Sequence, residues 1–311
     1  MGLERGEKND DALSALGIFD FVFSGHAHHR PRRMDVIETQ GKTLLHPGVH
    51  NGQAVVWGRF KMEREEGCIT RCISREGGAD LIDEMFDEDA EIKAWLQGYS
   101  DQFEAQLNVE IGACVGLSKY DGEPPINHTF QSTLAEAMLA TFSDTGASFS
   151  AMNAAGIRGE IPPGVIQYRH IEAAWPWKNN VYHCELSGAL IMDLLQANAV
   201  AIVNRVPDGM FLHFSGLDYD VVEGEPINVI MAGAPLNLEA WYGCVADQYL
   251  ITSAMQDNAK YPHAGLGQRK VMDMGVMTQT CILDYTKGLH AQGLLLGAQH
   301  SARTQAQTGT G

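Results

Sequence analysis

The spacing of apolar residues changes along the chain, and each change predicts a different element. Near the N-terminus, residues 19–23 are aromatic and β-branched and are followed by Ser24-Gly25, which predicts a strand that runs into a loop. A strand pair is expected at about 42–45 and 54–61, because Gly-containing turns separate these two apolar runs. Residues 1–62 are therefore predicted to be rich in β-structure.

The next segment, residues 63–107, is acidic and is predicted to be a helical linker. Its apolar residues recur at helical spacing and form one stripe of an amphipathic helix: Ile92, Trp95, Leu96, Tyr99 and Phe103.

Helix-like and strand-like patterns alternate over residues 108–290, which predicts one mixed domain. A helix is expected at about 132–142, a strand at 148–152, and a second helix near Ser187, which is a suitable N-cap. The last residues are polar and rich in Gly, Thr and Gln, so residues 291–311 are predicted to be a disordered tail.

The composition is that of a globular protein, with 45% apolar and 20% charged residues in 311 positions. The formal net charge of -17 would repel a nucleic-acid backbone, so no binding to a nucleic-acid polymer is expected. No run approaches the ~18 consecutive apolar residues of a membrane-spanning helix. The N-terminal residues also lack the apolar segment of a secretory signal peptide.

Six cysteines are scattered through the chain, which is not the arrangement of a disulfide framework. Cys68 and Cys72 could pair across a hairpin or share a metal ion. Unpaired thiols are the simpler interpretation.

Two histidines follow the first predicted strand at alternate positions. Alternate side chains of an extended segment share a side, so the imidazoles of His26 and His28 can point at one centre. Histidine nitrogen is a usual ligand of zinc, manganese and iron. The alternative is a basic loop in solvent, because three arginines follow within five residues of His28.

The run from Ile18 to His28 resembles the strand and Gly-His-x-His end of the metallophosphoesterase family, and residues 46–52 resemble that family's Pro-Gly turn. The resemblance implies a divalent metal pair, zinc, manganese or similar, with His26 and His28 as ligands and His28 in a catalytic role. Only 23 residues, none of them histidine, precede Ser24. The expectation is therefore that the N-terminal metal domain is missing and that this chain does not fully bind the metals.

A second set of landmarks begins with Asn153-Ala-Ala-Gly156-Ile-Arg158 after the strand predicted at 148–152. Pro176-Trp177, the helix after Ser187 and residues 214–219 follow in order. Together they resemble the C-terminal domain of 5'-nucleotidases, a group that includes UDP-sugar hydrolases and 2',3'-cyclic-nucleotide phosphodiesterases. The resemblance implies an α/β (α+β) fold over residues 108–290, with a mixed sheet flanked by helices.

The same resemblance implies a substrate site formed by Asn153, Gly156, Arg158 and Trp177. Arg158 would grip a phosphate or sugar oxygen, because the guanidinium fork matches two oxygens. Asn153 would bond the base or ribose, and Trp177 would stack on the base. From the residues alone, a surface ion pair is the favoured interpretation of Arg158, and core packing of Trp177 is as well supported as stacking.

The resemblance implies that this chain is a fragment of a metal-dependent phosphoester hydrolase of nucleotide catabolism, periplasmic or extracellular, whose partner is a nucleotide or another small phosphate ester. The isolated chain is expected to be inactive. The alternatives are a stand-alone nucleotide-binding or small-ligand-binding module without turnover, and a thiosulfohydrolase-like relative. Three departures from the family pattern weaken the nucleotide interpretation. Ala154-Ala155 replaces two glycines, and Thr129-Phe130-Gln131 stands where the family often has an arginine before its first helix. Residues 249–261 also lack the glycines of the segment that carries a second stacking ring.

Overall fold

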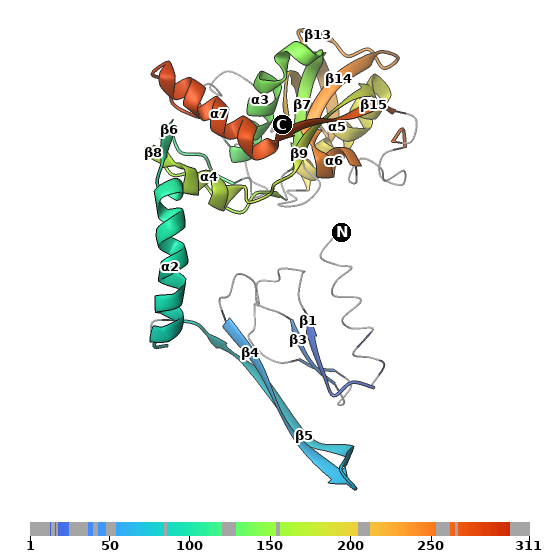
Figure 1. The fold of residues 1–311 in the computed structure, drawn as a ribbon. Helices are drawn as coiled ribbons and strands as arrows, with labels where there is room; N and C mark the ends of the chain where they lie inside the picture. Colours follow the sequence, from blue (N-terminus) through green and yellow to red (C-terminus); the bar gives the residue numbers. More distant parts are fainter. Residues whose placement is uncertain are drawn as a thin grey trace. The chain divides into compact units, whose positions relative to one another are not determined.

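The computed structural model divides into two compact units, Met1–Gln97 and Gly98–Gly311 (Figure 1). The residues that it describes are 13, 16, 18–24, 37–39, 43–47, 54–83, 86–119, 129–153, 156–204, 212–252, 262–264 and 267–298.

The first unit contains the β-structure that the sequence predicted, but with different strand partners. β3 (Thr43–Pro47) pairs with β1 (Phe21–Ser24) and β2 (Ile37–Thr39), whereas β4 (Ala54–Glu65) pairs with β5 (Cys68–Leu81). The predicted pairing of 42–45 with 54–61 is therefore wrong, and β5 occupies a segment predicted to be helical.

The physical reason for this pairing is a tight turn between β4 and β5. Glu66 and Gly67 both have positive φ, 49° and 84°, which is the geometry that matches the twist of a two-residue hairpin. This local turn selects the adjacent segment as the partner of β4. Cys68 and Cys72 consequently lie on the same strand and cannot pair across the hairpin.

The predicted amphipathic helix is present as α2 (Ala90–Leu107), and it begins where Asp89 caps it. The Asp89 carboxylate accepts the backbone N–H groups of Glu91 and Ile92, both at 3.0 Å. The apolar stripe is not buried, since the exposed fractions of its side chains run from 49% to 62% for Ile92, Trp95, Leu96, Tyr99 and Phe103.

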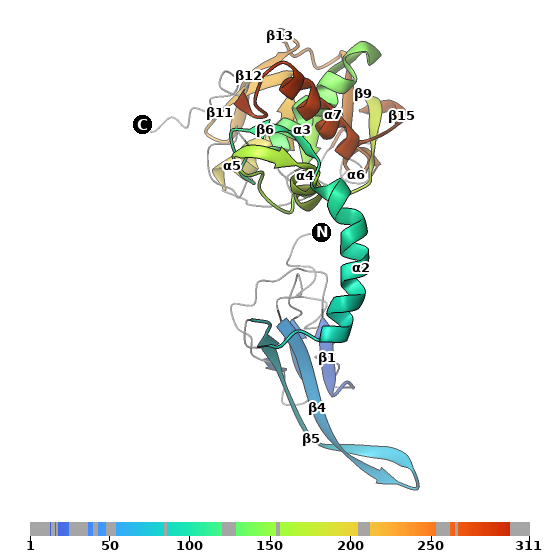
Figure 2. The ribbon, with the colours of Figure 1, turned by 60° about the vertical axis from the view of Figure 1, so that its left-hand side comes forward.

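The second unit is built on a mixed five-stranded sheet, as the sequence predicted (Figure 2). The central pair β7 and β14 is parallel, and the other neighbours are antiparallel. The strands in sheet order are β10 (Leu212–Ser215), β7 (Ala147–Asn153), β14 (Trp241–Asp247), β9 (Asn180–Ser187) and β15 (Gln268–Met277).

Helices cover both faces of this sheet, and β7 contributes to both layers because alternate side chains point to opposite faces. Met152 packs in the cluster that holds α3 (Phe130–Thr141) and α7 (Thr278–Ala291). Phe149 and Ala151 pack against α5 (Gly188–Val203) and α6 (Gln248–Thr252). The remaining elements are β6 (Glu110–Cys114), η1 (Ser143–Thr145), β8 (Gly164–Gln167), α4 (Tyr168–Ala174), β11 (Leu217–Val222), β12 (Glu225–Met231) and β13 (Ala234–Pro235).

Local capping explains where α5 and α3, the two helices that the sequence predicted in this unit, begin. Ser187 caps α5 as predicted, with its hydroxyl accepting the Leu190 N–H at 3.2 Å. The helix predicted at 132–142 is α3, and it starts two residues earlier, at Phe130. Thr129 caps it, because its hydroxyl accepts the Ser132 N–H at 3.2 Å.

The C-terminal segment assigned to a tail contains packed structure as far as it is described. Leu296 is fully buried, and its N–H donates to the carbonyl of Ala113 at 2.8 Å. Residues 299–311 lie outside the described part of the chain. Among the described residues, no helix is long and apolar enough to cross a membrane.

Candidate functional site

The candidate site lies where the central parallel strands end. Asn153 is the last residue of β7 and is 5% exposed. Ala246 of β14 stands level with Ala151 of β7, so Asp247, the last residue of β14, lies at the same edge of the sheet as Asn153. The carboxyl ends of parallel strands are the usual ligand-binding edge of such sheets.

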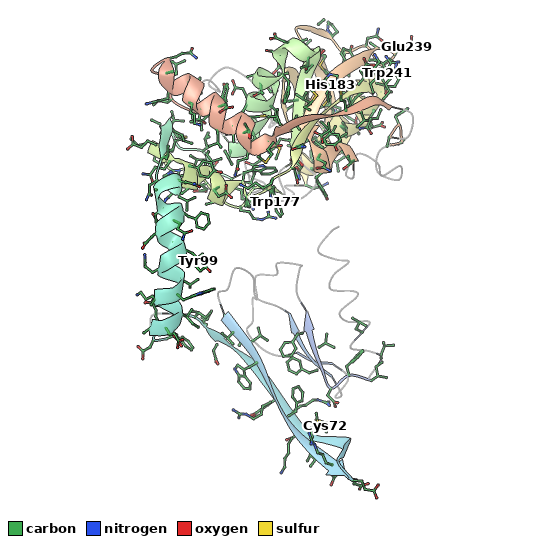
Figure 3. The ribbon with its side chains drawn as sticks, viewed as in Figure 1. Cys72, Tyr99, Trp177, His183, Glu239 and Trp241 are labelled. Atoms are coloured by element: carbon green, nitrogen blue, oxygen red, sulfur yellow. The ribbon has the colours of Figure 1, made fainter. Side chains whose placement is uncertain are left out.

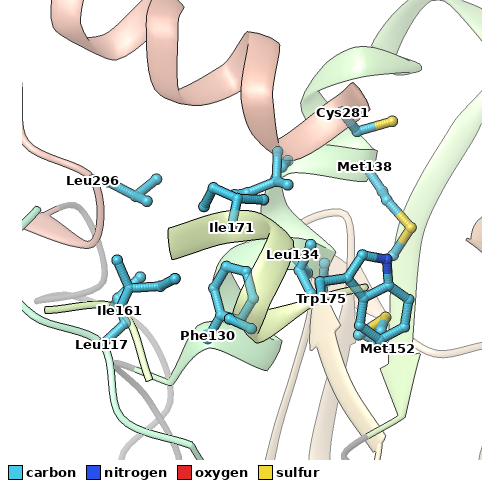
Figure 4. Close-up of a cluster of buried hydrophobic side chains, with 14 of the residues drawn as sticks. Leu117, Phe130, Leu134, Met138, Met152, Ile161, Ile171, Trp175, Cys281 and Leu296 are labelled. Atoms are coloured by element: carbon cyan, nitrogen blue, oxygen red, sulfur yellow. The ribbon is translucent and has the colours of Figure 1, made fainter. Parts of the chain in front are cut away.

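Gly156 is required by the close approach of Trp175, which follows α4. A Cβ added at Gly156 would lie 2.3 Å from Cζ3 of the Trp175 indole and 2.7 Å from Cη2. Trp175 is 1% exposed and packs beside Met138 and Met152 in the core (Figure 4). The 153–158 segment and the segment after α4 therefore meet at a point where no larger residue fits.

Trp177 contacts the same 153–158 segment at Gly156 and Arg158, and it is 39% exposed (Figure 3). Its indole N–H donates to the Gly156 carbonyl at 2.7 Å. The Arg158 guanidinium carbon lies 4.8 Å from the centroid of the Trp177 ring, a cation–π distance. The structure therefore brings Gly156, Arg158 and Trp177 together, and the core position that the sequence left open for Trp177 belongs to Trp175.

The backbone also joins the two segments, since the Arg158 N–H donates to the Ala174 carbonyl at 2.8 Å. This bond fixes the Cα of Arg158 beside the end of α4. The side chain of Arg158 then reaches back over Trp177, and its Nη1 lies 3.4 Å from the Ile157 carbonyl oxygen.

A polar network below Trp177 was not predicted from the sequence. Lys178 donates to Glu172 at 2.7 Å and to Gln279 at 2.7 Å, and Gln279 donates to the Trp175 carbonyl at 3.1 Å. Burial acts to raise the pKa of Glu172, but hydrogen bonds from Lys178 and Gln279 outweigh it, and the net pKa is lowered. The network ties residues 175–178 to α4 and α7.

Asp247 was also not predicted from the sequence as a residue of the site. Its carboxylate accepts the Asn179 side-chain N–H at 3.0 Å, the Tyr249 backbone N–H at 2.9 Å and the Thr278 hydroxyl at 3.0 Å. Burial raises the pKa of Asp247, and the three hydrogen bonds lower it by less. The sequence did carry a signal for Asp247, which is a carboxylate at the end of an apolar strand. Such a group is buried only where several hydrogen-bond donors surround it, so it indicates a polar site.

His213 is a buried titratable group at the same edge. It lies on β10 opposite Met152, and its Nδ1 is 3.4 Å from the Thr129 hydroxyl at the start of α3. Burial lowers the pKa of His213 from 6.5 to about 3. The imidazole is therefore neutral in the folded protein at any pH near neutrality.

This depressed pKa predicts an acid-dependent loss of stability. Between pH 6.5 and about 3 the unfolded chain binds a proton at His213 that the folded chain does not, so stability falls as the pH falls. From pH 7 to pH 5 we expect a loss of about 2 kcal/mol from this group. Urea unfolding at both pH values should show that His213→Gln loses less stability than the wild type. Equal losses in the two proteins would contradict the assignment.

The predicted metal ligands, His26 and His28, lie outside the described residues, as do Ala154 and Ala155. Within the part of the chain that the structure does describe, no three His, Cys, Asp or Glu side chains gather as a metal site requires. The described residues therefore do not fit a metal centre.

Comparisons with known proteins show which family this chain resembles. Residues 121–259, which include Asn153, Gly156, Arg158 and Trp177, match the family model described as 5'-nucleotidase, C-terminal domain. A 5'-nucleotidase of Vibrio vulnificus is 27% identical over 170 residues, which make up 54% of this chain and 30% of that protein.

Two solved structures share the fold. A 5'-nucleotidase precursor from Thermus thermophilus superimposes with a TM-score of 0.63 at 20% identity, covering 90% of this chain and 59% of that one. The sulfate thiohydrolase SoxB of the same organism gives a TM-score of 0.56 at 19% identity, over 92% of this chain and 51% of that one. The chain thus spans well under half of the Vibrio protein and about three fifths of the first structure. The resemblance to the 5'-nucleotidase C-terminal domain is confirmed.

Proposed function

We propose, from the match of residues 121–259 to the 5'-nucleotidase C-terminal domain, that this chain binds a nucleotide or a related small phosphate ester. The observation that carries the proposal is the position of the Arg158 guanidinium over the partly exposed indole of Trp177, 4.8 Å from the ring centroid. The guanidinium lies over one face of the indole and would leave the other face for a base, so the two groups match the two chemical parts of a nucleotide.

Each residue of the site then has a separate task. The guanidinium of Arg158 presents parallel N–H donors to a phosphate or sugar oxygen. The indole of Trp177 offers an aromatic surface to the base, and its N–H bond to Gly156 holds the ring in place. The amide of Asn153, at the end of β7, would bond the base or ribose.

The reaction class follows from the family, and we propose that the chain is part of a larger metal-dependent phosphoester hydrolase of nucleotide catabolism outside the cytoplasm. His26 and His28 remain its proposed metal ligands, with His28 in the catalytic role. In such enzymes a metal pair supplies an activated water and stabilises charge on the phosphate oxygens. The described residues bind and orient the ester, and we assign no catalytic step to them.

Isothermal titration calorimetry tests the proposal. Adenosine 5'-monophosphate is expected to bind the chain more tightly than adenosine or inorganic phosphate, because it engages both Trp177 and Arg158. Adenosine and phosphate serve as matched probes for the two halves of the site. If none of several 5'-nucleotides produces binding heat or stabilises the fold, the proposed function is wrong.

A hydrolysis assay tests the division of labour within the proposed enzyme. The chain alone is expected not to hydrolyse p-nitrophenyl phosphate when manganese or zinc is added, because two imidazoles do not hold two divalent ions with useful affinity. A complete 5'-nucleotidase in the same assay is the positive control. Turnover by the chain comparable to that control would show that its own residues suffice for catalysis.

A further inference from the structure

The segment that carries Trp177 is bonded at its C-terminal end to the carboxylate of Asp247. Asn179, two residues after Trp177, donates its side-chain N–H to Asp247 at 3.0 Å, and its own carbonyl accepts the Thr278 N–H at 3.0 Å. Thr278 also donates its hydroxyl to Asp247 at 3.0 Å. Asp247 and the start of α7 therefore clamp the end of the Trp177 segment.

The same carboxylate reaches a second segment at the edge of the sheet. The Tyr249 backbone N–H donates to Asp247 at 2.9 Å, at the start of α6, and the Tyr249 side chain is half exposed. Asp247 is thus bonded both to the segment that follows Trp177 and to the start of α6.

Burial makes this arrangement demanding. Asp247 is 1% exposed, and the donors that it accepts from are neutral: an amide side chain, a backbone N–H and a hydroxyl. A buried carboxylate without such donors would be strongly destabilising, and each donor that it binds is fixed in direction. Loss of the carboxylate leaves the half-buried side-chain N–H of Asn179 without this acceptor.

We propose that Asp247 is a positioning residue of the ligand site, which acts through Asn179 to hold Trp177 in register with Arg158. The assignment rests on the proposed nucleotide-binding function. Asp247 does not contact the ligand in this proposal. Asp247 affects affinity by fixing the position of the Trp177 ring, because a small displacement of that ring weakens its contact with the ligand.

The test uses the full chain labelled with 5-fluorotryptophan, whose five indoles include Trp177. The variant Trp177→Phe assigns its ¹⁹F resonance. We expect Asp247→Ala to shift or broaden the Trp177 resonance and to weaken binding of adenosine 5'-monophosphate about tenfold. The resonance of Trp57, in the first unit, should not move.

Two further variants separate positioning from general loss of structure. Asp247→Asn should restore both readouts, because an amide can accept from Asn179 and Tyr249 through its oxygen and donate to the Thr278 hydroxyl. If Asp247→Ala does not fold, Asn179→Ala replaces it, since it removes only the link between Asp247 and the Trp177 segment. The matched control is Asn180→Ala, whose side chain donates instead to Asp273 on the exposed strand β15 at 3.0 Å.

The outcomes distinguish the two proposals. A moved Trp177 resonance without any nucleotide binding by the wild type would overturn the proposed function and keep the positioning role of Asp247. A folded Asp247→Ala or Asn179→Ala that leaves both the resonance and the affinity unchanged would overturn the positioning role. The same holds if Asn180→Ala has an equal effect.

Discussion

Replacing Arg158 with alanine is expected to weaken binding of adenosine 5'-monophosphate about a hundredfold, or about 2.7 kcal/mol. The change removes charge-assisted hydrogen bonds to the phosphate and also the cation that lies over Trp177, 4.8 Å from its centroid. Adenosine, which has no phosphate, should lose much less affinity. Calorimetric titration of both ligands into both proteins measures the two losses.

The second unit offers a matched control for this change. Arg269 also lies over a tryptophan, 3.9 Å from the Trp241 centroid, and it pairs with Glu185 at 2.5 Å. Arg269→Ala should leave nucleotide affinity unchanged. Trp241 lies on β14, Glu185 on β9 and Arg269 on β15, and none of the three belongs to the 153–158 segment. Unchanged affinity in Arg158→Ala would instead return Arg158 to the role of a surface residue.

Replacing Gly156 with alanine is expected to destabilise the fold by about 2–3 kcal/mol. The new methyl group would lie 2.3 Å from the six-membered ring of Trp175, so the indole or the loop must move. Trp175 is buried among core residues, which include Met138 and Met152, and has little room to move (Figure 4). Urea unfolding measures the loss, and ¹⁹F-labelled Trp175 should report the displaced ring.

Gly159→Ala is the control for this substitution within the same loop. A Cβ at Gly159 meets only the Cα of Ala174, at 3.9 Å, which is ordinary contact, so a change of less than about 0.5 kcal/mol is expected. Combining Gly156→Ala with Trp175→Leu should cost less than the sum of the two single changes, because the smaller side chain removes the clash. If the losses in free energy of unfolding are fully additive, contact with Trp175 is not the reason that residue 156 must be glycine.

The pattern of apolar residues correctly predicted the elements whose cause is local. The α5 N-cap at Ser187, the strand ending at Asn153 and the helix beneath the 92–103 stripe all depend on period and capping within a few residues. Strand pairing in the first unit failed because the Glu66-Gly67 turn, which selects the partner of β4, was not recognised.

The sequence alone, through its family resemblance, determined that this protein has a mixed sheet flanked by helices. It also predicted a site at Asn153, Gly156, Arg158 and Trp177, of which the structure brings the last three together. Only the tertiary structure decided which of two tryptophans fills the core, why residue 156 must be glycine, and which carboxylate holds the Trp177 segment. Trp175 and Trp177 have the same side chain and stand two residues apart, so no local sequence pattern shows which of them is buried. Asp247 and Asn179 are 68 residues apart, and their bond exists because β14 and the segment after α4 end at one edge of the sheet.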